Sequence, residues 1–312
     1  MNQHPLVIVC GPTGSGKSAL ALAIARRFTG EVVNCDSVQI YRHFDIGAAK
    51  TPPEERAGVP HHLIDLAEPG EVFTAGDYAR LGRQTLREIA GRGRLPVVAG
   101  GTGFYLRALL HGLFDGPPRN DVLRRSLFAR EARRPRALHK LLARWDTAAA
   151  ARIHRNDTAK LARALEVILT QKQSLTELFQ RGRDPLTGFQ ALWLGLNPPR
   201  LALYERLDAR ARRMFAEDGI VEETRAILAR GYPADAKPFE SLGYAQALAC
   251  IRGEMTLEQA IAATQMFTRR YAKRQWTWFR REPGIEWLSG FGTDEALQQQ
   301  ALSRVSEFLA HP

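Results

Sequence analysis

The chain has 312 residues, of which 45% are hydrophobic and 25% charged, and it carries a formal net charge of +11 at pH 7. This length exceeds that of a usual single domain, so we expect one large α/β unit with an insertion, or two domains. No apolar run approaches the roughly 18 residues needed to span a bilayer, and the first residues lack a secretory signal; a cytoplasmic protein without membrane spans is therefore expected.

The first predicted strand, residues 6–10, leads directly into the sequence GPTGSGKS at 11–18. Glycines allow the backbone of such a loop to curl so that its N–H groups point at phosphate oxygens, while Lys17 adds a positive charge and Ser18 can bind Mg²⁺. The alternative is a glycine-rich turn without a ligand. A strand before the motif and a helical pattern after it favour phosphate binding. The predicted phosphate-binding residues are Gly11, Pro12, Thr13, Gly14, Ser15, Gly16, Lys17 and Ser18.

A second apolar run, residues 31–35, ends at Asp36, Ser37, Val38 and Gln39. An aspartate beside a phosphate-binding loop can bind Mg²⁺ through water, or it can act as a general base. It can also simply cap the next helix. Ser37 and Gln39 offer the donors and acceptors that suit the edge of a base. Cys10 and Cys35 fall inside these first two runs and are expected to be core residues.

A third run, residues 95–99, ends in Gly100, Gly101, Thr102 and Gly103. Thr102 can approach a phosphate closely because its neighbours lack side chains, although a helix-capping role is the alternative. The missing carboxylate at this position argues against a motor or a typical NTPase. Because the carboxyl ends of parallel strands form the binding crevice of a doubly wound sheet, we expect all three motifs to converge there.

The middle of the chain is helical and strongly basic. Residues 115–185 show helices rich in Ala, Leu and Arg without a strand signal, with Asp115 and Pro117-Pro118 at the entry and Arg183 near the exit. Residues 119–183 hold sixteen Lys or Arg against six Asp or Glu, a net charge of +10. A solvated face is one explanation. A nucleic-acid partner explains the imbalance better, so we predict an inserted RNA-binding domain.

After a fourth strand at residues 191–196, the chain is expected to be helical almost to its end. Arg206 and Arg210 are spaced to share one helix face, where they could bind a diphosphate or form ion pairs with Glu205 or Asp208. His61 and His62 are adjacent on an extended segment and point in opposite directions, so hydrogen bonding is expected rather than metal binding. Four glycines are predicted to stop helices: Gly182, Gly219, Gly231 and Gly253.

Residues 269–281 hold six cations and four aromatic residues. This combination suits phosphate contacts and stacking on unpaired bases. An amphipathic helix with its rings in the core is the alternative, and some of the rings are expected to be buried. We predict that at least part of this segment contacts RNA.

Taken together, the motifs resemble the tRNA dimethylallyltransferases, also called tRNA isopentenyltransferases. The matching segments occur in the family order at residues 11–18, 36–50, 60–66, 100–109, 152–167, 241–246 and 271–280. Gly14, Ser18 and Val38 replace the more frequent Ala, Thr and Met, and none of these changes removes a functional group. The resemblance implies a P-loop NTPase-like parallel sheet with helices on both faces plus a basic all-helical insertion.

The resemblance also implies an activity: transfer of a dimethylallyl group from dimethylallyl diphosphate to N6 of the adenosine just 3′ of the anticodon. It implies a monomer that uses Mg²⁺ bound at Ser18, a tRNA anticodon stem-loop as partner, and tRNAs that read codons beginning with U. The implied catalytic residues are Lys17, Asp36, Thr102 and Arg210. The implied tRNA-binding residues are Asp36, Ser37, Val38, Gln39, Thr102, Arg124, Lys160, Leu161, Ala162, Arg163, Ala164, Glu240, Ser241, Leu242, Gly243, Tyr244, Ala245, Lys273, Arg274, Gln275, Trp276, Thr277, Trp278, Phe279 and Arg280.

Two other classes share some of these features. A small-molecule kinase or ATPase has the same loop and sheet, but it needs a second metal carboxylate and an adenine-binding segment, which the sequence does not offer at recognisable positions. A protein that only binds RNA would have no need of Lys17 and Asp36.

Overall fold

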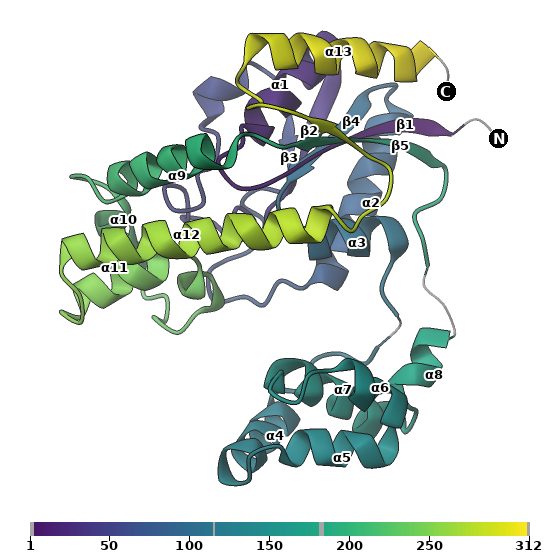
Figure 1. The fold of residues 1–312 in the computed structure, drawn as a ribbon, viewed down its shortest axis with the longest axis vertical. Helices are drawn as coiled ribbons and strands as arrows, with labels where there is room; N and C mark the ends of the chain where they lie inside the picture. The colour runs from purple at the N-terminus through teal and green to yellow at the C-terminus, as the bar shows by residue number, and fades with distance from the viewer. Residues whose placement is uncertain (1–2, 115, 181–183, 311–312) are drawn as a thin grey trace. The chain divides into compact units, whose positions relative to one another are not determined.

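The computed structural model describes residues 3–114, 116–180 and 184–310 (Figure 1). They form two compact units, Met1–Leu110 with Leu186–Pro312, and His111–Pro185. We call them the α/β unit and the helical unit. The residues named above as boundary or helix-stop positions, Asp115, Gly182 and Arg183, lie outside the described part of the chain.

The α/β unit contains a six-stranded parallel sheet of order β3-β2-β4-β1-β5-β6. Its strands are β1 His4–Cys10, β2 Gly30–Cys35, β3 His61–His62, β4 Leu95–Gly100, β5 Phe189–Leu196 and β6 Ile285–Leu288. In the centre, Val7 of β1 lies opposite Val97 of β4 and Leu192 of β5. The parallel sheet and its four long strands confirm the prediction. The short edge strands β3 and β6 were not predicted.

Helices cover both faces of this sheet, as predicted (Figure 1). Helices α1 (Lys17–Arg27) and α13 (Glu295–Ala310) pack on one face, where Leu20, Ile24 and Val305 join the apolar side chains of the strands in one buried cluster. Helices α2 (Ala75–Gly91) and α3 (Gly103–His111) lie on the other. The hydroxyl of Tyr78 on α2 donates to the carbonyl of Asn34 at 2.9 Å. Cys10 and Cys35 are fully buried, as expected.

The remainder of the α/β unit is mainly helical. It contains α9 Arg200–Met214, α10 Ile220–Ala229, α11 Tyr244–Ile251, α12 Leu257–Phe279 and the 3₁₀ helices Pro53–Arg56 and Lys237–Glu240. Gly231 and Gly253 follow the ends of α10 and α11 with positive φ, which confirms them as helix stops. The prediction for Gly219 was wrong: α9 already ends at Met214, and Gly219 is the N-cap of α10.

The helical unit has its own core. It contains α4 Asp121–Arg133, α5 Ala137–Trp145, α6 Thr147–Arg152, α7 Thr158–Gln171 and α8 Leu175–Gln180, and its described residues form no strand. Leu127, Leu138, Leu142 and Leu165 are among the buried side chains that hold these helices together. Across the described part of both units, no helix combines the length and the apolar character needed to cross a membrane.

One carboxylate is completely buried in the helical unit. Glu166 on α7 accepts hydrogen bonds from the Asn120 N–H at 2.6 Å, from Arg163 at 2.7 Å and from Arg124 at 3.3 Å. Burial by itself would raise the pKa of Glu166, but the hydrogen bonds and the two guanidinium charges outweigh it and hold that pKa below its usual value. Arg124 and Arg163 therefore have a structural partner.

Candidate active site at the carboxyl edge of the sheet

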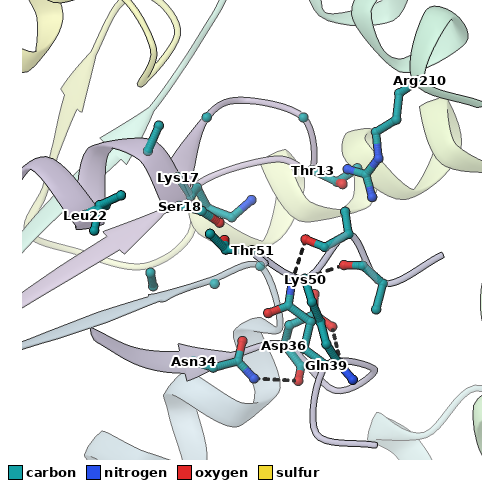
Figure 2. A pocket seen from close by; sticks show the side chains of 18 of the residues that line it. Thr13, Lys17, Ser18, Leu22, Asn34, Asp36, Gln39, Lys50, Thr51 and Arg210 are labelled. Carbon is teal, nitrogen blue, oxygen red and sulfur yellow. Dashed lines mark hydrogen bonds between the residues drawn. The ribbon is translucent and has the colours of Figure 1, made fainter. Parts of the chain in front are cut away.

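The three polar motifs converge at one cavity, as their positions in the sequence predicted. The cavity has a volume of about 660 Å³ and is lined by the loop after β1, by Asp36 after β2 and by Gly100 and Gly101 of the β4 end (Figure 2). Of the phosphate-loop residues, Gly11, Pro12 and Ser15 are buried, while Thr13, Gly14, Gly16, Lys17 and Ser18 line the cavity.

The phosphate-binding loop leads into an uncapped helix N-terminus. Gly16 is the N-cap of α1 with φ 89°; it makes no side-chain cap, and no acidic residue follows in the first turn. Free N–H groups and the helix dipole therefore favour an anion at this position. A Cβ at Gly16 would lie 2.9 Å from the Gly292 nitrogen, so both the backbone conformation and the space require glycine there.

Lys17 is poorly hydrated. Burial lowers its pKa to about 8, although the nearby Asp36 acts in the opposite direction. Its Nζ donates to the carbonyl of Pro12 at 2.8 Å, so the ammonium lies against the loop itself. An anion in the cavity would compensate the charge that the protein leaves poorly solvated.

Arginines of α9 face the loop from the opposite side. Arg206, Arg210 and Arg213 line the cavity, and Figure 2 shows Arg210 extending from α9 toward Thr13. Burial lowers the pKa of Arg210, and the neighbouring arginines add to this effect. Within residues 3–114, 116–180 and 184–310, neither Arg206 nor Arg210 forms an ion pair.

The surface ion pair considered for these arginines is not formed with Asp208. That carboxylate instead accepts from Arg269 on α12 at 2.6 Å. Arg206 donates to the Thr293 hydroxyl at 3.2 Å and lies over the Phe291 ring. The geometry therefore favours the anion-binding interpretation of the two α9 arginines.

Asp36 lies where two cavities meet. Its Oδ1 accepts from the N–H groups of Val38 at 2.8 Å and Gln39 at 3.3 Å, so it does stabilise the turn after β2. A second cavity of about 330 Å³ shares four lining residues with the first: Thr13, Asp36, Ala48 and Arg210. The two cavities are therefore adjacent, and Asp36 is one of the residues that lie between them.

The second cavity differs from the first in chemistry. Leu207, Met214 and Leu242 give it apolar walls, and Tyr271 and Arg274 of α12 add polar groups. Burial raises the pKa of Tyr271, so its hydroxyl remains protonated. In addition to Asp36, six of the predicted tRNA-binding residues line this second cavity, namely Ser37, Val38, Glu240, Ser241, Leu242 and Arg274.

A loop that sequence reasoning did not single out borders both cavities. Gln39 Nε2 donates to the carbonyls of Ala48 at 3.1 Å and Ala49 at 3.3 Å, while the Gly47 N–H donates to the Tyr244 hydroxyl at 3.0 Å. A Cβ at Gly47 would lie 2.2 Å from the Tyr244 ring. The sequence did contain a signal for this loop, because residues 36–50 match the family; Gly47 in this segment allows the backbone to lie close to the Tyr244 ring.

Thr102 has a different environment from the one expected. Its Oγ1 accepts the N–H of Ser37 at 3.2 Å, and its carbonyl accepts from Tyr105 at 2.9 Å at the start of α3. It lines neither cavity. The geometry supports the helix-start interpretation and links Thr102 to the site through Ser37.

In the other predicted RNA-binding segments, only some of the side chains are exposed and able to contact RNA. Leu161, Ala162 and Ala164 are core residues of the helical unit, whereas Lys160 on the same helix is 72% exposed. Among the predicted residues of 273–280, Gln275, Trp276 and Phe279 are buried, whereas Lys273, Arg274, Thr277 and Arg280 are exposed. Tyr244 is fully buried against the loop described above. Trp278 is half-buried beneath the Arg107 guanidinium.

His61 and His62 have hydrogen-bonding partners, as expected. His62 pairs with Glu31 at 2.6 Å, and His61 Nδ1 contacts the carbonyl of Val59 at 2.9 Å. The described residues contain no group of three or more His, Cys, Asp or Glu that could hold a metal ion.

Comparison with known proteins identifies the family. The model for IPP transferases matches residues 39–282. A tRNA dimethylallyltransferase of Solibacter usitatus is 60% identical, covering 98% of this chain and 99% of the relative, and one of Koribacter versatilis is 56% identical, covering 97% and 98%. The solved tRNA isopentenylpyrophosphate transferase of Bacillus halodurans is 36% identical with a TM-score of 0.71, covering 99% of this chain and 96% of that one. A eukaryotic dimethylallyltransferase acting on tRNA is 27% identical with a TM-score of 0.84, covering 98% and 80%. The chain therefore belongs to the IPP transferase family, as its motifs predicted.

Proposed function

We propose that this chain transfers a dimethylallyl group from dimethylallyl diphosphate to N6 of the adenosine just 3′ of the anticodon, in tRNAs that read codons beginning with U. The observation that carries the proposal is the adjacency of two cavities that share Thr13, Asp36, Ala48 and Arg210. The first cavity offers phosphate-binding groups, and the second offers apolar and hydrogen-bonding walls. A diphosphate ester in the first cavity and a base in the second would meet beside Asp36.

The reaction needs both a leaving group and a base. The lone pair of an exocyclic adenine nitrogen is delocalised into the ring, so N6 is a weak nucleophile. As its bond to the allylic carbon forms, the C–O bond to the diphosphate breaks and the electron pair leaves with the diphosphate. Asp36 accepts the proton that N6 loses, which makes it the general base.

The charge that develops on the diphosphate is stabilised by groups already in place. These are the N–H groups of the loop and of the α1 N-terminus, together with Lys17 and Arg210. Charges held in a poorly hydrated cavity act more strongly than they would in water. Thr102 contributes indirectly, because it fixes the Ser37 N–H beside Asp36.

The residues present also fit a magnesium ion. Ser18 lines the phosphate-binding cavity and offers a hard oxygen ligand, and Mg²⁺ in phosphate sites is usually held by one or two such groups together with substrate oxygens and water. Bound there, the ion would add positive charge next to the leaving diphosphate.

The base and the rest of the tRNA use other surfaces. Gln39 lines the phosphate-binding cavity, as does its neighbour Asp36, and from there it would help to hold the edge of the adenine beside Asp36 once the base is flipped out of its stack. The exposed cations of the helical unit and of α12 would bind the backbone of the anticodon stem-loop. We further propose that the protein acts as a monomer in the cytoplasm.

A single assay tests this proposal. The protein is incubated with labelled dimethylallyl diphosphate and total tRNA, with and without ATP. We expect label in tRNA, release of diphosphate and no requirement for ATP. Steady ATP hydrolysis stimulated by a small metabolite, without label transfer, would indicate a kinase. Binding of tRNA without either reaction would indicate an RNA-binding protein.

A further inference from the structure

Gln275 of α12 connects two loops that follow different strands of the sheet. Its side chain is buried, with 5% exposed. Oε1 accepts the N–H of Thr13, after β1, at 2.7 Å, and Nε2 donates to the carbonyl of Gly101, after β4, at 3.0 Å. We propose that Gln275 is a positioning residue that holds the phosphate-binding loop in its ligand-binding conformation. This inference deepens the proposed function and rests on it.

The chemistry of the contact requires an amide. The backbone N–H of Thr13 needs an acceptor, and the carbonyl of Gly101 needs a donor. A neutral glutamine supplies both from one rigid group, whereas glutamate lacks the donor. A Cβ at Gly101 would lie 2.1 Å from Gln275 Nε2, so the close approach also depends on glycine.

The phosphate-binding loop is rich in glycine and therefore needs hydrogen bonds to hold it in one conformation. Gly11, Gly14 and Gly16 all have positive φ, and glycine loses more conformational freedom on ordering than any other residue. The Lys17 contact with the Pro12 carbonyl is made by the same ammonium that would bind the ligand. Gln275 lines neither of the two cavities, so its hydrogen bond to the loop does not compete with a ligand.

A second hydrogen bond limits the expected effect. The Ser15 carbonyl accepts the Gly292 N–H at 2.8 Å, so the loop remains partly held without Gln275. We therefore expect a loss of preorganisation worth about one hydrogen bond, which corresponds to roughly tenfold in affinity.

The position of Gln275 separates this role from tRNA binding. Its neighbours Lys273, Arg274 and Thr277 are exposed, whereas Gln275 faces the sheet. Helix α12 thus presents cations on one face and a loop tether on the other. Substitutions on the two faces should affect different ligands.

The test compares Gln275→Met with Gln265→Met. Methionine has a similar length but forms neither strong hydrogen bond. Gln265 is on the same helix and donates to the Asp208 carbonyl of α9 at 3.1 Å, rather than to the phosphate-binding loop. The measurements are the Kd for inorganic diphosphate by calorimetry, the KM for dimethylallyl diphosphate and the Kd for tRNA.

We expect Gln275→Met to weaken diphosphate binding about tenfold and to raise the KM for dimethylallyl diphosphate, with tRNA affinity unchanged. Gln265→Met should leave all three values unchanged, and Lys273→Ala should weaken only tRNA binding. Wild-type diphosphate affinity in Gln275→Met would overturn the inference. So would equal losses in Gln275→Met and Gln265→Met, because they would indicate general loosening of α12.

Two further outcomes keep the inference distinct from the proposed function. The wild-type protein could bind diphosphate without transferring label, while Gln275→Met loses that binding. This result would refute the proposed function but support the positioning role of Gln275. Should Gln275→Met fail to fold, amide exchange in the wild-type protein provides the test. The Thr13 N–H should be protected without any ligand, and exchange at the rate of a free amide would refute the tether.

Discussion

A buried carboxylate in the helical unit and the cations at the phosphate-binding cavity of the α/β unit are held in opposite ways. The helical unit buries a carboxylate, Glu166, between two arginines and a backbone N–H. Four cations line the phosphate-binding cavity without an ion pair to any described residue, namely Lys17, Arg206, Arg210 and Arg213. Unpaired charge in a poorly hydrated site costs stability and is retained where a ligand compensates it. In this protein, paired buried charge therefore indicates structure, and unpaired buried charge indicates function.

The largest effect is expected at Asp36, which lies between the two cavities. Asp36→Asn retains the Oδ1 acceptor for the Val38 and Gln39 N–H groups but cannot accept a proton. Turnover should fall about 10²- to 10⁴-fold, equally in Asp36→Asn and Asp36→Ala, while tRNA affinity changes little. Single-turnover transfer to tRNA measures this. An active Asp36→Asn beside an inactive Asp36→Ala would restrict Asp36 to its turn-forming role.

Lys17→Met should abolish transfer and yet stabilise the fold. The pKa of Lys17 is lowered from 10.5 to about 8, so the folded state disfavours the charged form. Burying the charged ammonium lowers the stability of the folded state. This loss of stability is complete below pH 8, decreases as the pH rises, and is absent above pH 10.5, the pKa in the unfolded state. The free energy of unfolding of Lys17→Met should therefore exceed that of the wild type by about 2–3 kcal/mol at pH 7, and this difference should disappear near pH 10.5.

Urea unfolding at both pH values measures the effect, and Lys50 provides the matched control. Lys50 lines the same cavity but pairs with Asp45 at 2.7 Å and Asp65 at 2.5 Å. Lys50→Met should therefore destabilise the protein at pH 7. If both substitutions destabilise it, the contrast between unpaired and paired cations is wrong.

In the helical unit, Glu166→Gln should destabilise the core. Glutamine can still accept from the Asn120 N–H, but the charge that holds Arg124 and Arg163 is lost, at a cost of about 2 kcal/mol. Hydrogen exchange in peptides of α4 and α7 should accelerate, while peptides of the α/β unit remain unchanged. The control is Glu177→Gln, which is exposed and keeps its bond to the Ser174 N–H. Equal acceleration in both variants would contradict the structural role of Glu166.

The sequence predicted the parts of the site that follow long apolar strands. The phosphate-binding loop, Asp36 and Gly101 each come directly after such a run, and parallel strands bring their ends to one edge. The strands β3 and β6 have only two and four residues at the sheet edges, too short for a pattern. Gly219 was misassigned because a glycine before a helix and one after a helix look alike in sequence. The role of Gln275 was not predictable, because its partner Thr13 is 262 residues away.

The smallest expected effect concerns the basic surface. Lys160 and Arg163 both lie in a segment that matches the family, but Arg163 is held by Glu166 at 2.7 Å and by the Pro117 carbonyl at 2.9 Å. Arg163→Ala therefore combines a loss of folding stability with any weakening of tRNA binding. Lys160 is 72% exposed and pairs only at the surface with Asp157, so its removal leaves the core intact.

If Lys160 binds a tRNA phosphate, its removal should reduce the slope of log affinity against log salt by just under one unit. We expect Lys160→Ala to flatten this slope for every tRNA alike, with no change in thermal stability. Arg26→Ala, an exposed cation on α1 outside every matching segment, should leave the slope unchanged. Equal slopes in wild type and Lys160→Ala would show that this part of the helical unit is merely solvated. The net charge of the unit would then have to act through other arginines, beginning with the exposed ones of α4.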